Sequence, residues 1–279
     1  RWRFFRPQRA LPSVHRPPSM LLCLDIGNSQ IHGGVFDGDA LQCQFRKTTH
    51  PLGSSDEFGV FFLSVLRENG VDPRAVRRVA LCSVVPPALH PIRSAGLKYF
   101  HLDPFVLQAG VKTGLKVRYR NPQEVGADRI AGAIAATQRW PNRNLIVVDC
   151  GTATTFDVVT AENDYLGGAI LPGLGISVEV LAGKTAKLPT VEIMRPATAL
   201  GRSTVESIQA GVYHGQVGAI RHLVQELARE AFPGGKPVVI GTGGFARLLL
   251  PENLFDEIVP ELVLLGLKHA DAMNRESGS

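Results

Sequence analysis

The chain has 279 residues, of which 44% are hydrophobic and 20% are charged, an ordinary globular composition with enough apolar residues for one large domain or two lobes. No apolar run reaches the roughly 18 residues of a membrane-spanning helix, so we expect no membrane partner. The net charge of +5 comes from arginines in residues 1–19, and the rest is close to neutral. Nucleic acid is therefore not expected as a partner, because phosphate-backbone binding needs clustered Lys and Arg.

Residues 1–19 read as a disordered basic extension. They contain four prolines, show no helical periodicity and have no apolar stretch of signal-peptide length. Met20 lies directly before the first apolar strand, so we expect the native chain to begin there.

The cysteines and histidines show no metal-binding spacing. Cys23, Cys43, Cys82 and Cys150 form no C-x-x-C pair, and the eight His form no H-E-x-x-H motif. Cys23 and Cys150 lie in apolar strand segments, where Cys behaves as a small hydrophobe. This pattern indicates a reducing compartment, and we expect the protein to be cytoplasmic.

The first part of the body alternates strands and helices. Leu21–Asp39 reads as strand, tight turn and strand, and a third strand follows at 40–49. Apolar residues at helical spacing predict a helix over 55–69, followed by a buried strand at 76–85 and a second helix at 89–100. This alternation predicts a mixed sheet with helices on its faces.

The first turn, Asp25-Ile26-Gly27-Asn28-Ser29, has the residues of a phosphate-binding turn. An Asp at the end of a strand can bind Mg²⁺ or its water ligands, since Mg²⁺ prefers hard oxygen ligands and keeps several waters. Gly27 allows the backbone to approach a phosphate closely, and Asn28 and Ser29 add donors. The structural alternative is an Asx turn in a plain hairpin.

The same order of elements restarts at residue 145. The segment Leu145–Asn163 aligns without gaps with Leu21–Asp39, so Asp149 and Gly151 take the places of Asp25 and Gly27. In Asp149-Cys150-Gly151-Thr152-Ala153-Thr154-Thr155, hydroxyl groups can donate to phosphate oxygens and the Asp can hold a cation. The match indicates an internal duplication.

Asp128 and Arg129 lie between the two turns, at the expected start of a helix. The helix macrodipole favours the ionised carboxylate there, so Asp128 can accept a proton from a substrate hydroxyl. Arg129 can bind a carboxylate or a phosphate. The alternative is a helix-capping Asp beside a solvent-exposed Arg.

Two features follow the second turn. A long helix is predicted over 203–232, with a capping box of Ser203 and Glu206 and with glycines at 211, 215 and 218 that suit close approach of another backbone at a subunit interface. Gly241-Thr242-Gly243-Gly244 lies between a strand and a helix start and suits an adenosine-binding wall. Gly183-Lys184-Thr185 lacks the spacing and flanks of a P-loop.

Two Asp-Gly turns with a late Gly-Thr-Gly-Gly loop resemble the actin, sugar-kinase and heat-shock ATPase superfamily. Within it, the segments DIGNS, NPQEVGADR, DCGTATTFD, GGAILPG, AKLP and GTGG resemble type III pantothenate kinases from Met20 to about Asn274. The resemblance implies an α/β fold of two duplicated actin-like (ribonuclease H-like) lobes, with mixed sheets flanked by helices and a nucleotide cleft between them. We expect an N-terminal lobe over 20–125 and a C-terminal lobe over 126–279.

The resemblance also implies activity, cofactors and site residues. It implies a homodimer that uses ATP, Mg²⁺ and K⁺ or NH₄⁺ to phosphorylate pantothenate to 4′-phosphopantothenate, the first step of coenzyme A biosynthesis. Asp128 matches the proton acceptor, Asp149 the monovalent-cation ligand, and Asp25 the Mg²⁺ side, possibly through water. The matched ATP contacts are Asp25, Ile26, Gly27, Asn28, Ser29, Gln30, Ile31, His32 and Thr152. The matched pantothenate contacts are Tyr119, Gly126, Ala127, Asp128, Arg129 and Thr204.

Ser29 departs from the Thr common at its position but keeps the hydroxyl group. Three other functions stay open on the sequence alone. One is a kinase or phosphatase of the same fold that acts on a different alcohol, and another is an ATP-binding scaffold. The third is a non-catalytic accessory or regulatory protein, against which the retained Asp25, Asp128 and Asp149 argue.

Overall fold

A computed structural model describes residues 19–275, so the prediction for residues 1–19 lies almost wholly outside the described residues. The first sheet has the strand order β3-β2-β1-β4-β5. Its strands are β1 (Met20–Ile26), β2 (Gln30–Asp37), β3 (Ala40–Thr48), β4 (Val76–Ser83) and β5 (Phe105–Val106). The predicted hairpin, third strand and buried strand are confirmed, with β1 antiparallel to β2 and parallel to β4.

The second sheet repeats this arrangement, with the order β11-β10-β7-β8-β9-β6. Its strands are β6 (Lys116–Val117), β7 (Leu145–Cys150), β8 (Ala153–Val159), β9 (Asp164–Pro172), β10 (Val238–Thr242) and β11 (Glu257–Ile258). In both sheets a three-strand antiparallel meander is extended by two parallel strands on the side of its first strand. The predicted duplicated lobes with mixed sheets are confirmed. The predicted division at residue 125 stays a prediction, and β6, which precedes it, already pairs with β9.

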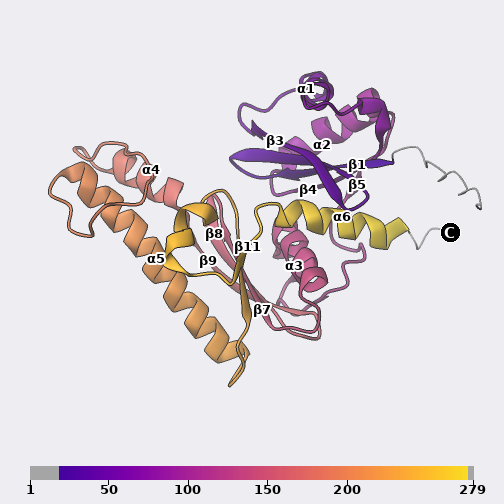
Figure 1. The fold of residues 1–279 in the computed structure, drawn as a ribbon. Coiled ribbons are helices and arrows are strands. Elements are labelled where there is room, and N and C mark those ends of the chain that lie inside the picture. The colour runs from indigo at the N-terminus through magenta and orange to yellow at the C-terminus, as the bar shows by residue number, and fades with distance from the viewer. Residues whose placement is uncertain (1–18, 276–279) are drawn as a thin grey trace, which may run out of the picture.

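The helices and sheets stack in layers (Figure 1). Helices α1 (Ser55–Glu68) and α2 (Pro86–Ala95) cover the outer face of the first sheet, and α3 (Ala127–Arg139) and α6 (Leu262–Arg275) lie between the sheets. Helix α5 (Thr204–Ala231) covers the far face of the second sheet. Among residues 19–275, no helix is long and apolar enough to cross a membrane.

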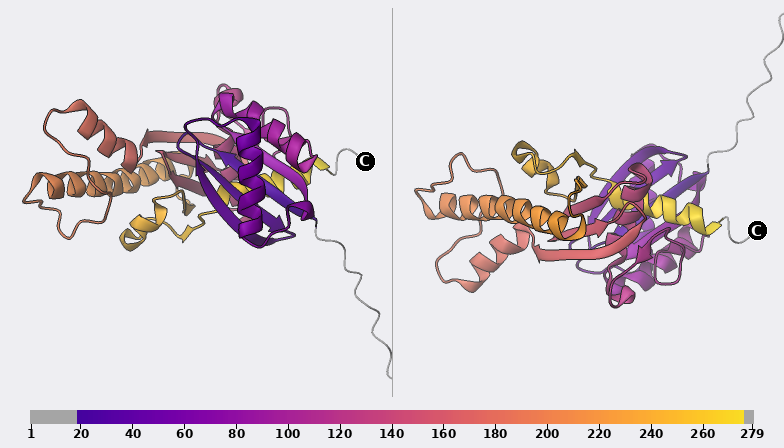
Figure 2. Two further views of the ribbon diagram at one scale, coloured as in Figure 1. Left: turned by 90° about the horizontal axis from the view of Figure 1, so that it is seen from above. Right: turned by 90° about the horizontal axis from the view of Figure 1, so that it is seen from below.

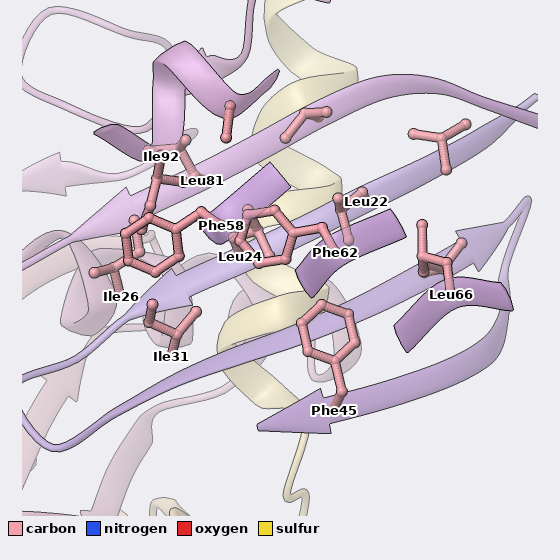
Figure 3. Close-up of a cluster of buried hydrophobic side chains, with 14 of the residues drawn as sticks. Leu22, Leu24, Ile26, Ile31, Phe45, Phe58, Phe62, Leu66, Leu81 and Ile92 are labelled. Atoms are coloured by element: carbon pink, nitrogen blue, oxygen red, sulfur yellow. The ribbon is translucent and has the colours of Figure 1, made fainter. Parts of the chain in front are cut away.

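The outer core explains why the predicted first helix forms. Ser54 and Glu57 make a complete capping box at the start of α1. Phe58, Phe62 and Leu66 follow at helical spacing, and all three are fully buried against β1 and β2 (Figure 3). The second predicted helix begins earlier than expected, at Pro86, because proline is favoured in a first helical turn.

The layer between the sheets depends on a close helix crossing. A Cβ atom on Gly266 of α6 would lie 1.8 Å from the carbonyl oxygen of Ala131 on α3, so only glycine fits there. Buried residues of α6 pack against the first sheet through Val263, Leu264 and Leu267. The last helix of the chain therefore completes the core of the first lobe.

Helix α4 (Leu174–Lys184) and the start of α5 project away from both lobes (Figures 1 and 2). Gly183 and Lys184 end α4, in agreement with the rejection of a P-loop there. Ser203 accepts a hydrogen bond from the Glu206 backbone, as predicted, but the Glu206 carboxylate accepts from the Arg202 N–H instead of closing the capping box.

Candidate active site

The two predicted phosphate turns meet across the cleft between the lobes. Residues 27–29 join β1 to β2, and residues 151–152 join β7 to β8. The Ser29 and Thr152 hydroxyl oxygens are 2.8 Å apart, in hydrogen-bond contact. In each turn the glycine N–H donates to a carbonyl at the start of the next strand, Gly27 to Gln30 and Gly151 to Ala153, although the second turn is one residue shorter. The duplicated hairpins thus present their tips to a single site.

The side chains of the eight consecutive residues matched to ATP, 25–32, do not all lie on the same face of the first sheet. The side chains of Ile26 and Ile31 are fully buried under α1 and α2, so only their backbone can face the turn. His32 lies opposite Asp25 in the β1–β2 register, and its Nε2 atom is 3.2 Å from the Gln44 Oε1 atom. Burial, followed by the nearby Arg46 charge, lowers the pKa of His32 to about 4. A neutral imidazole therefore lies beside Asp25.

Three carboxyl groups share the cleft. Burial, and then the charges of Asp128 and Asp149, raise the pKa of Asp25 to about 8. Burial, and then the charges of Asp128 and Asp157, raise the pKa of Asp149 to about 7. Burial also raises the pKa of Asp128. Such clustered, desolvated carboxyl groups are characteristic of sites that bind cations or move protons.

The raised pKa values predict that the ligand-free protein loses stability as pH rises from about 6.5 to 8. The folded state holds protons on Asp25 and Asp149 that the unfolded chain has already released. The resulting contribution to the free energy of unfolding is present at low pH, and it is lost as the pH rises through the pKa values of these groups in the folded state. The pH range of this prediction begins near 6.5 because, at lower pH, the lowered pKa of His32 makes stability rise with pH and so opposes the effect of the two carboxyl groups. We expect a loss of about 2 kcal/mol in urea unfolding without Mg²⁺ or K⁺.

The control for this measurement is Asp25→Asn. In that variant the loss of stability between pH 6.5 and 8 should shrink to less than half. An equal loss in Asp25→Asn and wild type would contradict the assignment of this pH dependence to Asp25.

Asp128 lies in the first turn of α3, as predicted, with Gly126 as the residue before the helix. Its Oδ1 atom accepts a hydrogen bond from the Arg129 N–H at 2.8 Å. The Asp128 charge raises the pKa values of both Asp25 and Asp149, after burial. Asp128, the predicted proton acceptor, therefore lies close enough to the aspartates of both turns to influence their pKa values.

Arg129 is held by a buried ion pair that the sequence analysis did not anticipate. Its Nε atom donates to Asp157 Oδ1 at 2.8 Å, and an Nη2 atom donates to the Phe156 carbonyl at 3.2 Å. The Tyr165 hydroxyl also donates to Asp157, at 2.5 Å. Asp157 is eight residues after Asp149 in the quoted motif, but no spacing rule links it to Arg129. The pairing fixes the guanidinium next to Asp128.

The residues matched to pantothenate form two groups. Tyr119 packs over Gly167, 3.0 Å from the position of a Cβ atom there, and against the buried cluster that includes Ala133 of α3. Tyr119, Gly126, Ala127, Asp128 and Arg129 thus belong to one region. Thr204 lies apart, at the start of α5, in a cavity of about 1100 Å³ between α4 and α5. None of the cleft carboxyl groups lines that cavity.

The Gly-Thr-Gly-Gly loop contacts the second turn directly. Gly243 has a φ angle of +86°, and a Cβ atom there would lie 2.2 Å from Asp149 Oδ1 and 2.6 Å from the Cys150 carbonyl carbon. The predicted helix start after it is a 3₁₀ helix, Ala246–Glu252, with Pro251 near its end. The loop therefore sets the position of the Asp149 carboxyl group.

We expect Gly243→Ala to lower kcat/KM by about 100-fold, since displacement of a catalytic group by about 1 Å has costs of this size. The matched control is Gly244→Ala, because a Cβ atom at Gly244 meets nothing within 4 Å. Steady-state kinetics and melting temperatures of both variants test this. Equal activity in the two alanine variants would show that Asp149 does not depend on the Gly243 contact.

The donor set at both turns fits cations. Among residues 19–275, the Thr155 Oγ1 atom is buried without a hydrogen-bond partner, and Thr155 pairs with Asp149 in the β7–β8 register. No group of three or more His, Cys, Asp or Glu residues suited to a metal ion occurs in this part of the chain. One carboxylate with waters and phosphate oxygens is a common Mg²⁺ environment. Asp25 and Asp149 with Thr155 suit such cation binding.

The paired turns and the repeated strand order define an actin-like fold of the sugar-kinase and ATPase type. Solved structures support this fold at low sequence identity. A Campylobacter jejuni protein, provisionally described as a Baf family transcriptional activator, has a TM-score of 0.58 at 19% identity and covers 91% of this chain and 99% of its own. Component A of (R)-2-hydroxyglutaryl-CoA dehydratase from Acidaminococcus fermentans has a TM-score of 0.51 at 14% identity, with 94% and 100% coverage.

The sequence comparisons narrow this class to one family. The family model for type III pantothenate kinase matches residues 21–226. A type III pantothenate kinase of Legionella pneumophila (strain Corby) is 56% identical over 255 residues, covering 91% of this chain and 99% of the relative. One from Elusimicrobium minutum is 45% identical over 256 residues, with 92% and 99% coverage. The chain belongs to the type III pantothenate kinase family.

Proposed function

We propose that this chain transfers the γ-phosphoryl group of ATP to the primary hydroxyl of pantothenate, giving 4′-phosphopantothenate and ADP in the first step of coenzyme A biosynthesis. The observation that carries the proposal is the contact of the two turns. The Ser29 and Thr152 hydroxyls are 2.8 Å apart, with the carboxyl groups of Asp25, Asp149 and Asp128 around them. Family membership supplies the substrate.

Asp128 is the proposed general base. The pantothenate hydroxyl oxygen attacks the γ-phosphorus, the bond to the β-phosphate oxygen breaks, and the hydroxyl proton passes to the Asp128 carboxylate. A carboxyl group with a raised pKa is a better proton acceptor than a solvent-exposed one. The Arg129–Asp157 pair holds the start of α3 against β8 and so positions the base.

The turns hold the nucleotide. The backbone N–H groups of residues 28–29 and the hydroxyls of Ser29 and Thr152 would donate to phosphate oxygens. Asp25 would hold Mg²⁺, directly or through water, and Asp149 with Thr155 would hold K⁺ or NH₄⁺. Bound cations neutralise charge on the transferring phosphoryl group, which is the main requirement of phosphoryl transfer.

The active form is proposed to be a homodimer. Thr204 lies in the α4–α5 cavity and not at the cleft, so a pantothenate contact by this residue suits the site of a second copy. Val180 of α4, Val205 of α5 and Leu200 of the segment between these helices are exposed, and open space adjoins Gly211 and Gly215. We expect a dimer in light scattering, and we expect Gly215→Leu to shift it toward monomer. A wild-type monomer at micromolar concentration would contradict the dimer.

We place the protein in the cytoplasm. The four cysteines are free thiols and all are buried, as in a reducing compartment. Coenzyme A biosynthesis from ATP also requires a compartment that contains ATP.

The deciding experiment measures pantothenate-dependent release of ADP, with a panel of sugars and other small alcohols as competitors for the role of substrate. ADP release with pantothenate supports the proposal. Release with a sugar but not with pantothenate would assign a different kinase activity. ATP binding without turnover on any alcohol would favour the accessory or regulatory alternative.

A further inference from the structure

Arg46 occupies a position on the cleft face that the site described above does not use. In the first sheet, Asp25 pairs with His32 and His32 pairs with Arg46, so the three residues form a row across β1, β2 and β3. Directly paired residues of antiparallel strands point to the same face of a sheet. Arg46 therefore lies on the face that carries Asp25, whereas its neighbour Phe45 packs on the opposite face.

The distance across this row suits an arginine. Neighbouring strands are about 5 Å apart, which places the Arg46 Cα atom about 10 Å from that of Asp25. The long side chain spans most of that distance. Its Nη1 atom is 3.4 Å from the Gln30 Oε1 atom, at the base of the first turn. The guanidinium group thus lies beside the residues that approach the nucleotide phosphates.

Arg46 is available for a ligand. Its side chain is exposed, and among residues 19–275 it forms no ion pair, whereas Arg129 is already paired with Asp157. The guanidinium group can therefore donate to a ligand on the face of the first sheet that carries Asp25.

We propose that Arg46 binds the terminal phosphates of the nucleotide and supplies the fixed positive charge that a P-loop lysine supplies in other kinases. An ATP phosphate chain placed beside three carboxyl groups brings many negative charges together. Without a positively charged side chain, bound cations alone would have to neutralise both the phosphates and the carboxylates. Arginine suits this task, since its planar guanidinium can donate two parallel hydrogen bonds to phosphate oxygens. The inference rests on the proposed nucleotide site but not on pantothenate as the substrate.

The test compares Arg46→Gln with Lys47→Gln. Both variants lose one positive charge from adjacent residues of β3, but the Lys47 ammonium group lies on the other face, 5.5 Å from the centre of the Phe58 ring. Titration calorimetry without pantothenate measures the binding of ATP and of AMP. We expect Arg46→Gln to weaken ATP binding by about 10- to 100-fold, as for loss of hydrogen bonds to a charged group, and to leave AMP binding within about twofold.

The kinetic consequence is a fall of about 100-fold in kcat/KM for ATP in Arg46→Gln, with partial recovery in Arg46→Lys, which keeps the charge but not the fork of donors. Lys47→Gln should match wild type in both assays. ATP binding by Arg46→Gln within about twofold of wild type, or an equal loss of ATP and AMP binding, would overturn the inference. A wild-type protein that binds ATP but does not phosphorylate pantothenate would refute the proposed substrate alone, because the binding comparison still decides the role of Arg46.

Discussion

Asp128→Asn should lower kcat by about 10²- to 10⁴-fold while the protein keeps its fold. The amide has the same shape but cannot accept the proton of the attacking hydroxyl, and general-base catalysis contributes about this factor. The first turn of α3 should persist, because an amide oxygen at this position can still accept the hydrogen bond from the adjacent Arg129 N–H. The neutral amide also removes a carboxylate that lies near two other buried carboxyl groups, so the melting temperature should stay equal or rise.

The matched control is Asp56→Asn, which removes an acidic residue from the first turn of α1, far from the cleft carboxyl groups. Both variants lose the interaction of a carboxylate with a helix N-terminus, and Asp56→Asn also loses the ion pair with Lys98. A fall in kcat in Asp128→Asn alone therefore reports the role of Asp128 and not a loss at a helix end. Steady-state ADP release and thermal unfolding measure the two effects. Turnover near the wild-type rate in Asp128→Asn would remove Asp128 as the base.

Activity should depend on K⁺ or NH₄⁺, with a fall of at least about tenfold in kcat/KM when Na⁺ replaces them. The reason is the set of oxygen atoms at Asp149. A buried carboxyl group and a Thr155 hydroxyl that has no hydrogen-bond partner within residues 19–275 together suit a weakly hydrated cation. Asp149→Asn should be poorly active in either salt and should respond little to the exchange.

Thr155→Val provides a second variant for this cation site. It keeps the β-branched shape of the side chain on β8 but removes the oxygen atom. We expect a higher K⁺ concentration for half-maximal activity in Thr155→Val, with a kcat near wild type at saturating K⁺. Full wild-type activity in Na⁺ alone would show that Asp149 does not bind an activating cation.

Much of the fold could be predicted from local patterns. The two Asp-Gly turns, the buried strands and α1 follow from apolar periodicity, and the gap-free alignment of the two hairpins anticipated the repeated strand order. The details of the helix ends could not be predicted in the same way. Helix α2 begins at Pro86, earlier than the apolar spacing indicates, and the segment after the Gly-rich loop forms a 3₁₀ helix where the sequence suggests only a helix start.

Several contacts in the site join residues that are far apart in the sequence, and no spacing pattern in the sequence predicts that they meet. Arg129 meets Asp157 only because α3 packs on β8, and Ser29 meets Thr152 only because the two lobes face each other. Gly243 had been read as part of an adenosine wall, and its contact with Asp149 becomes visible only in the folded chain. The individual assignments of ATP, pantothenate and cation contacts stay predictions that the variants above test.

The position of α6 has a consequence for how the protein is made. The first lobe is synthesised early, but the inner face of its sheet is covered by Val263, Leu264 and Leu267 from the last helix. The buried Asp271 on this helix also pairs with Arg78 of β4. During translation, the apolar inner face of the nascent first lobe therefore stays exposed until the ribosome releases the C-terminal segment. This interval is when the chain is most open to aggregation and to chaperone binding.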